Sequence, residues 1–464
     1  KVLVVIGFAL LLQLSGWILF GSGFFPSKTP LPGISSQAEQ KTKSNINLTQ
    51  YDKTFFIVID AFRADFIYNT IPFQNIELTS SHMPFLQKLI KNNEALPLIG
   101  KAQAPTVTLP RIKALLSGSL PSFWDFVENF NSPALQQDSL IHQFRQYSWQ
   151  SCFYGDDTWL HLFPPKENFF LRYEGTTSFF VSDTVEVDQN VTRCLHKELE
   201  RNRAHNDPKT ECDALILHYL GLDHIGHYQG PKSSLLPPKL TEMDNIIHEI
   251  FNHITKYDKI RCQNKKQNNC ASLMVITGDH GMNELGNHGG SSALEIDTGL
   301  ILIDPKWSQA KKDQNNKITN FPNITKPIEV NQVDLIPTLS LLFGLPIPKN
   351  SLGKIIPDAF INFTAEEKLQ AFIINADQLI KVIQGNKKFW EQEIPKTEQI
   401  AQIWKKYQAL SVEVSAMYAA HAPKNKTKIS LELIPRYYNL VNEISEVFVE
   451  LLTEYDTNKL FSGV

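Results

Sequence analysis

Acidic and histidine side chains gather directly after three apolar, strand-like runs of the sequence. FFIVID ends in an aspartate, LILHYLG is followed by LDHIGH, and LMVITG is followed by DHG and then GNHGG. Carboxylate oxygens and imidazole nitrogens are ligands that zinc prefers, and two ions about 4 Å apart can polarise a phosphoryl oxygen. A two-zinc site for phosphoryl chemistry is therefore predicted from Asp60, Asp223, His227, Asp279, His280 and His288.

Such a site needs an alcohol to activate, and Thr108 is the first candidate. In APTVTLPRIKALLSG it lies two residues before Pro110, at the predicted start of a helix. A helix start offers partial positive charge and free N–H groups to a phosphate. Thr106 is the alternative nucleophile.

The elements that must position these residues alternate between strands and helices. The strands are expected at TFFIVID, APTV, QSCFYG, CDALILHYLG and SLMVITG, with helices at MPFLQKLIKNNEA and TLPRIKALLSG. Strands that are apolar on both faces and separated by helices predict a parallel-dominated sheet covered on both faces. Ligands bind beyond the carboxyl ends of such strands. We therefore predict an α/β catalytic domain over residues 53–355.

Two further regions flank this domain. Residues 1–25 are almost entirely apolar and long enough to cross a bilayer, so we predict an uncleaved anchor with Lys1 in the cytoplasm. A cleaved signal peptide and a buried helix are the alternatives. Residues 26–52 have the composition of a linker. Residues 356–464 contain three amphipathic patterns and form a helical extension, packed on the body or on a membrane neighbour.

Composition and cysteine usage narrow the setting. The 45 Lys and Arg residues against 48 Asp and Glu residues leave a charge of -3, which gives no support for nucleic-acid binding. Among the five cysteines, Cys262 and Cys270 flank a polar loop that a local disulfide could close. A lumenal location predicts glycans, and the Asn-x-Ser/Thr acceptors are Asn47, Asn190, Asn323, Asn362 and Asn425.

Taken in order, the ligand motifs and the Thr-x-Pro at Thr108 resemble the alkaline phosphatase superfamily. Longer stretches resemble the luminal domain of the GPI ethanolamine phosphate transferases over roughly residues 50–355. GTTSFFVSD is most similar to the member that modifies the second mannose. The stretches that carry the resemblance include IDAFRADF, APTVTLPRIKALLSGSLPSF, YGDDTW, LHYLGLDHIGH and GDHGMNELGNHG.

The resemblance implies a site and a reaction. It favours Thr108 over Thr106, because the superfamily places its nucleophile two residues before the proline. Thr108 would take phosphoethanolamine from phosphatidylethanolamine and pass it to a mannose 6-hydroxyl of the GPI-anchor precursor. One zinc would be held by Asp60, Asp279, His280 and Thr108, and the other by Asp223, His227 and His288.

The resemblance also implies a membrane setting. The domain would lie in the lumen of the endoplasmic reticulum, attached to its membrane, with a small membrane subunit as a candidate partner. Family members continue into a multi-helix membrane domain, so the chain resembles the anchor and luminal part of a longer protein.

Four residues are candidates for substrate binding. Asp156, Asp157 and Trp159 in YGDDTW could receive the ethanolamine ammonium through charge and cation–π contact. Lys113, one turn into the helix after Thr108, could meet the phosphate. The ordinary alternatives are acidic caps and a solvated lysine.

Three other functions compete with the transferase. A nucleotide pyrophosphatase/phosphodiesterase would use the same metals and pass the phosphoryl group to water. A sulfatase would need a residue convertible to formylglycine, which threonine is not. A non-catalytic luminal binding subunit is expected to lack one or more ligands, and none is missing from this sequence.

Overall fold

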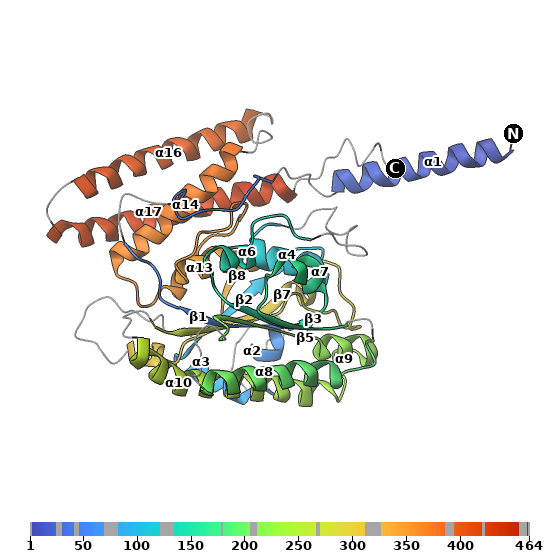
Figure 1. The fold of residues 1–464 in the computed structure, drawn as a ribbon. Helices are drawn as coiled ribbons and strands as arrows, with labels where there is room; N and C mark the ends of the chain where they lie inside the picture. The colour runs from blue at the N-terminus through green and yellow to red at the C-terminus, as the bar shows by residue number, and fades with distance from the viewer. Residues whose placement is uncertain are drawn as a thin grey trace.

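The computed structural model describes most of the chain, including every predicted metal ligand. The described residues are 2–24, 30–40, 46–68, 82–120, 134–177, 180–204, 211–265, 270–310, 326–385, 394–419, 423–453 and 462. The first helix, α1 (Val2–Phe24), stands away from the body (Figure 1). Its residues Val2–Gly21 are long and apolar enough to cross a membrane.

The body is built on an eight-stranded sheet among the described residues, in the order β4-β3-β5-β1-β6-β7-β2-β8. β7 runs antiparallel to β6 and β2, and the other neighbouring pairs are parallel. The predicted parallel-dominated sheet is therefore confirmed. The strands are β1 (Lys53–Ile59), β2 (Ala95–Lys101), β3 (Ser151–Asp156), β4 (Arg172–Thr176), β5 (Ala214–Tyr219), β6 (Ser272–Thr277), β7 (Asp297–Ile303) and β8 (Ile328–Asn331).

Helices cover both faces of this sheet, as the apolar strands require (Figure 1). Every residue of β1, β3, β5 and β6 is buried, and two hydrophobic cores lie on the two faces. One face carries α4 (Thr108–Ser117), α6 (Leu140–Gln146), α7 (Thr158–Leu162) and α13 (Leu335–Leu342). The other carries α2 (Asp65–Tyr68), α3 (Pro84–Lys91), α8 (Glu186–Ala204), α9 (Gly221–Gln229) and α10 (Leu236–Lys265).

One predicted strand is wrong. APTV forms the connection between β2 and α4, and the strand that precedes it is ALPLIGK. Pro105 cannot donate to a strand ladder, which explains the failure at APTV. Pro97 and Gly100 are rare inside strands, so β2 is not recognisable from the sequence pattern. Pro97 is tolerated because β8 pairs with β2 only from Leu98 onward. β4, β7 and β8 were not predicted at all.

The described part of the predicted linker is bound to the body. The backbone of Leu31 exchanges two hydrogen bonds with the Asn350 amide, at 2.7 and 2.9 Å. The Ser35 N–H donates to Asp138 at 2.8 Å, and the Gln40 side chain exchanges two bonds with the backbone of Ile347. Residues 30–40 therefore follow the surface of the domain.

The C-terminal region is helical, as predicted. α14 (Ala365–Gly385), α16 (Ile394–Ala419) and α17 (Pro423–Thr453) pack together, and α17 contacts both of the others. Their apolar faces join the core beside α13. The packed body thus extends beyond the sheet.

Two disulfides are present. Cys262–Cys270 closes the predicted local loop, and Cys152–Cys212 joins the starts of β3 and β5. Cys194 is a buried free thiol. Glu198 lies near Cys152 and Cys212, but disulfide-bonded cysteines offer no thiolate to a metal.

Candidate active site

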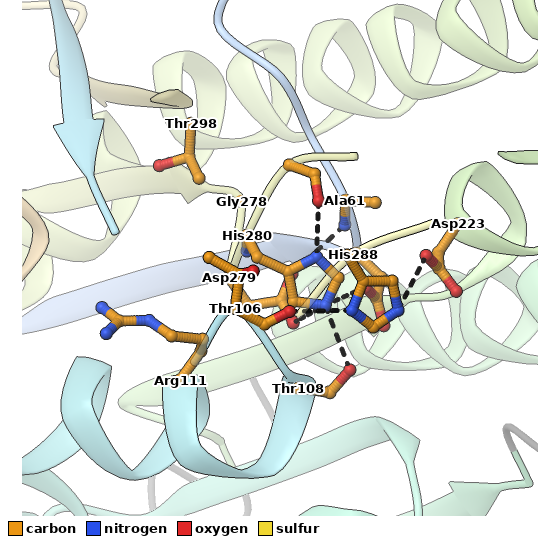
Figure 2. A network of polar contacts seen from close by, with 12 residues as sticks. Ala61, Thr106, Thr108, Arg111, Asp223, Gly278, Asp279, His280, His288 and Thr298 are labelled. Atoms are coloured by element: carbon orange, nitrogen blue, oxygen red, sulfur yellow. Dashed lines mark hydrogen bonds and ion pairs between the residues drawn. The ribbon is translucent and has the colours of Figure 1, made fainter. Parts of the chain in front are cut away.

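The strand order brings the predicted ligands to one edge of the sheet. β5, β1 and β6 are parallel neighbours, so their carboxyl ends lie side by side. Asp60 follows β1, Asp223 and His227 lie on α9 directly after β5, and Asp279 with His280 follows β6. His288 comes from the loop beyond them and reaches the same place (Figure 2).

The first cluster consists of Asp60, Asp279 and His280. The Nε2 atom of His280 lies 3.4 Å from Asp60 Oδ1 and 3.3 Å from Asp279 Oδ2. All three side chains are buried, and their ligand atoms lie within 4.8 Å of one another. Asp279 is held by the N–H groups of Ala61 and His280, which donate to its Oδ1 at 3.2 and 2.8 Å.

The second cluster consists of Asp223, His227 and His288. Asp223 Oδ2 lies 3.4 Å from His227 Nε2, and its Oδ1 lies 3.7 Å from His288 Nε2. The two histidines approach through their Nε2 atoms at 3.0 Å. This cluster is more open than the first, because the His227 side chain is 28% exposed. The second cluster is therefore the more accessible of the two.

Both clusters have the donor chemistry of cation sites. Among the described residues Asp60 Oδ1, Asp223 Oδ1 and Asp279 Oδ2 are buried without a hydrogen-bond partner. His280 Nδ1 donates to Gly281 O at 3.0 Å, and His288 Nδ1 donates to Thr106 O at 2.8 Å. In neutral rings these bonds leave both Nε2 lone pairs facing the carboxylates, the arrangement that metal-ligating histidines use.

The buried, unpaired carboxylates of the two clusters also favour a bound cation. Burial, followed by the charges of neighbouring aspartates, raises the pKa of Asp60 and of Asp223 well above the usual range. Burial lowers the pKa of His280 to about 3 and that of His288 to about 4. Buried carboxylates are costly unless they are paired, and neutral histidines cannot pair them.

The Thr108 hydroxyl faces the first cluster. Thr108 is the first residue of α4, and its Oγ1 lies 3.4 Å from His280 Nε2 (Figure 2). Thr106 is fully buried, and its hydroxyl donates to Gly290 O and accepts from the Gly289 N–H, both at 2.8 Å. The alternative nucleophile is therefore occupied in holding the loop that carries His288.

A buried arginine and glutamine support the site, and sequence reasoning missed both. The Arg111 guanidinium donates to Gln332 Oε1, and the Gln332 amide donates to the carbonyls of Gly278 and Asp279 at 2.7 and 2.8 Å. Arg111 lies one turn after Thr108 on α4, so this bridge ties the nucleophile's helix to the Asp279 loop. The TLPR motif could have indicated Arg111, but roles are predicted only for its threonine and proline.

The YGDDTW motif lies beside the site, but its tryptophan does not face a ligand. Trp159 is fully buried, stacks on Phe153 and donates its Nε1–H to His218 Nδ1 at 3.1 Å. The predicted cation–π contact is therefore corrected, because the core covers this ring. Asp156 is buried at the carboxyl end of β3, and burial raises its pKa to about 7. Asp157 is half-buried at the N-cap of α7.

The remaining predicted residues are placed as follows. Lys113 is buried in α4, and its contact with phosphate stays a prediction. Asn47 and Asn362 are exposed outside helices and strands, Asn190 is exposed on α8, and Asn425 lies in α17. Asn323 lies outside the described residues.

Comparison with known proteins places this geometry in a family. The family described as "Type I phosphodiesterase / nucleotide pyrophosphatase" matches residues 54–302, the part of the chain that contains the sheet edge and all the ligands. A solved structure of a protein in the alkaline phosphatase superfamily from Vibrio parahaemolyticus is 14% identical, with a TM-score of 0.45, over 76% of this chain and 80% of that one.

Two curated relatives are more similar in sequence. A GPI ethanolamine phosphate transferase 2 from Debaryomyces hansenii is 41% identical over 81% of this chain and 40% of that protein. One from Yarrowia lipolytica is 35% identical over 98% of this chain and 46% of that protein. The chain thus spans less than half the length of these relatives, and the second match includes the C-terminal helices.

Proposed function

Because the chain belongs to the type I phosphodiesterase / nucleotide pyrophosphatase family, we propose that it transfers phosphoethanolamine from phosphatidylethanolamine to a mannose 6-hydroxyl, that of the second mannose, of the GPI-anchor precursor. Relatives named GPI ethanolamine phosphate transferase 2 support the substrates. The observation that carries the proposal is the Thr108 hydroxyl, 3.4 Å from His280 at the edge of two complete ligand clusters.

The chain holds both parts of a two-step transfer. Thr108 Oγ1 forms a bond to phosphorus as the bond between phosphorus and the diacylglycerol oxygen breaks, and the hydroxyl proton ends on that leaving oxygen. The mannose 6-hydroxyl then attacks the same phosphorus, the bond between phosphorus and Thr108 Oγ1 breaks, and the proton of the mannose hydroxyl ends on Oγ1. The N–H groups of Thr108 and Leu109, in the first turn of α4, offer donors to the phosphate.

The ligand clusters suit two zinc ions. One would be held by Asp60, Asp279, His280 and Thr108, and the other by Asp223, His227 and His288. Such ions, when bound, polarise the phosphoryl oxygens and stabilise the attacking and leaving oxygens.

The positively charged ethanolamine ammonium requires an acidic partner, and Asp156 is the candidate. Its carboxyl group is close enough to the clusters to raise the pKa of Asp60 and of Asp223. We assign the ammonium to Asp156, with Asp157 beside it at the start of α7. Lys113 remains the candidate for a phosphate contact.

The proposed setting is the endoplasmic reticulum membrane. α1 would anchor the chain, with the sheet domain in the lumen and glycans on the exposed Asn47, Asn190 and Asn362. Asn323 and Asn425 complete the set of proposed acceptors. A small membrane subunit is proposed as the partner.

Mass spectrometry of the full chain tests the reaction. After incubation with phosphatidylethanolamine, we expect one phosphoethanolamine on Thr108, lost again when a mannose acceptor is added. Thr108→Ala should remove the adduct, whereas Thr106→Val should lower its amount but leave it on Thr108, because the Thr106 hydroxyl holds the His288 loop through Gly289 and Gly290. No adduct on Thr108 in the wild type would overturn the proposal.

The family match also supports a nucleotide pyrophosphatase/phosphodiesterase as a second candidate. The same experiment separates the two, because a nucleotide-derived adduct on Thr108 would favour hydrolysis. Full complementation by Thr108→Ala and Asp279→Ala, together with no bound zinc, would instead favour a non-catalytic luminal subunit.

A further inference from the structure

His218 is a buried residue of β5 that the proposed mechanism does not use. It pairs in register with Val58 of β1, two residues before Asp60. Its side chain is fully buried, and its Nε2 lies 3.7 Å from Asp60 Oδ2. A polar ring in this position needs a reason, because burying an unsatisfied polar atom costs free energy.

The hydrogen bond from Trp159 fixes the state of this ring. An indole N–H only donates, so His218 Nδ1, which receives it at 3.1 Å, must be an acceptor. A ring with an unprotonated Nδ1 carries its proton on Nε2.

The His218 atom that carries this proton is thus the one that lies 3.7 Å from Asp60 Oδ2. His218 Nε2 has no hydrogen-bond partner among the described residues, and neither does Asp60 Oδ1. The 3.7 Å distance is longer than a hydrogen bond, so the His218 Nε2–H lies near the Asp60 carboxylate without a hydrogen bond to it. Donors of this kind orient metal-binding carboxylates.

Two other features of YGDDTW place His218 in this position. Gly155 has a φ of 145°, and a Cβ atom there would lie 2.7 Å from His218 Cβ. The same Cβ would lie 2.3 Å from the His218 carbonyl oxygen, so only glycine lets β3 pass so close to β5 at His218. Trp159 itself is fixed by stacking on Phe153, at a centroid distance of 5.1 Å. The motif thus provides both the space and the donor that His218 needs.

We propose that Trp159 and His218 are positioning residues for Asp60, with Trp159 holding the His218 tautomer whose Nε2–H secures that carboxylate as a metal ligand. This inference rests on the proposed function for the identity of the site. It concerns the first cluster only, since the contacts of Asp223, His227 and His288 do not include His218.

Metal retention by the full chain tests the proposal without any substrate. Purified protein is loaded with zinc, and loss of each equivalent to a competing chelator is measured. We expect His218→Leu and Trp159→Phe each to weaken one equivalent about tenfold and leave the other unchanged. His218→Gln, which keeps a donor near the Nε2 position, should retain zinc better than His218→Leu.

Two controls separate positioning from packing. Trp149→Phe changes a tryptophan that also stacks on a phenylalanine, Phe144, but has no contact with His218, and it should retain both equivalents. The double variant Trp159→Phe/His218→Leu should be no worse than His218→Leu alone, because Trp159 acts through His218. If His218→Leu does not fold, Trp159→Phe and His218→Gln still give the comparison.

The outcomes are distinguishable from those of the proposed function. Zinc retention equal to the wild type in both Trp159→Phe and His218→Leu would overturn the positioning role. Equal losses of zinc in Trp159→Phe and Trp149→Phe would also overturn it. A wild type that binds no zinc would also overturn it. If Trp159→Phe weakens one equivalent but the wild type forms no adduct on Thr108, the transferase proposal fails and the positioning role stands.

Discussion

At the scale of single residues, the site contains several buried acidic side chains whose negative charges repel one another. Asp60, Asp223 and Asp156 all have a pKa raised first by burial. Two of them belong to the ligand clusters, whereas Asp156 belongs to neither. An acid in that position can select a cationic substrate group, and this gives Asp156 a pH signature of its own.

We expect the KM for phosphatidylethanolamine to fall as the pH rises through about 7. Burial raises the pKa of Asp156 to about 7, so the charged form that attracts ammonium dominates only above that pH. Asp156→Asn should raise KM roughly tenfold at pH 8, the value of one hydrogen bond to a charged group, and should remove this component of the pH dependence. Steady-state kinetics between pH 6 and 8 measure both effects.

A donor lipid with ethanol in place of ethanolamine is the matched control, because it has no ammonium. Its KM should be equal for the wild type and Asp156→Asn. Equal KM values for both proteins with phosphatidylethanolamine would remove the ammonium-binding role from Asp156.

At the scale of elements, the site depends on contacts between the ends of different strands and helices. α4 carries Thr108 and Arg111, and the segment after β6 carries Asp279. Gln332, at the end of β8, joins them through its amide. This bridge holds Thr108, the proposed nucleophile, and Asp279, a proposed ligand, in a fixed relative position.

Arg111→Met should lower kcat about tenfold with little change in KM. The substitution leaves Gln332 without its anchor, so Thr108 and Asp279 lose their relative positions while the substrate surface is unchanged. It should also cost about 1–3 kcal/mol of unfolding free energy, because it leaves the buried acceptors of Gln332 and Gln103 unpaired. Steady-state kinetics and denaturant unfolding measure the two effects.

Arg145→Met, on the exposed side of α6, is the control for loss of an arginine. It should change neither kcat nor zinc retention. A normal kcat in Arg111→Met would show that the bridge serves stability alone.

At the scale of the whole molecule, the proposed ligands lie after β1, on α9 and in the segment after β6, so metal binding would be coupled to folding. A metal that binds the folded chain stabilises it by about 4 kcal/mol when its free concentration is 1,000 times its dissociation constant. Because three separate elements supply the ligands, chelation should lower the melting temperature of the body.

The stabilisation by zinc should grow as the pH rises from 5.5 to 8. Without metal, Asp60 and Asp223 have a raised pKa, so these two carboxyl groups bind more protons in the folded than in the unfolded chain above pH about 4, and their contribution to stability falls as the pH rises. Zinc removes this loss by keeping both carboxylates ionised. Burial lowers the pKa of His280 to about 3 and that of His288 to about 4, so both rings are neutral in this range without metal, and histidine binds metal in its neutral form.

Scanning calorimetry with zinc and with a chelator gives the two melting temperatures at each pH. Asp60→Asn should show a smaller difference between them than the wild type. A difference that narrows with rising pH would contradict the linkage.

The sequence by itself indicated which residues meet in the two candidate metal clusters. Alternating strands and helices bring carboxyl ends to one edge of a sheet, so Asp60, Asp223 and Asp279 could be placed from local pattern alone. The Thr-x-Pro motif placed Thr108 in the same way. Local pattern failed at β2, where Pro97 and Gly100 conceal a strand that tertiary pairing imposes.

Only the tertiary structure decided which polar groups support the clusters. Trp159 meets His218 across 59 residues of sequence, and Arg111 meets Gln332 across 221. No local periodicity encodes such contacts, because they depend on how the strands are ordered and how side chains pack between them. The positions of the proposed ligands can be predicted from the strand ends, whereas the residues that support them depend on side-chain packing. For this reason Trp159 of YGDDTW, predicted as a substrate contact, is instead a buried hydrogen-bond donor.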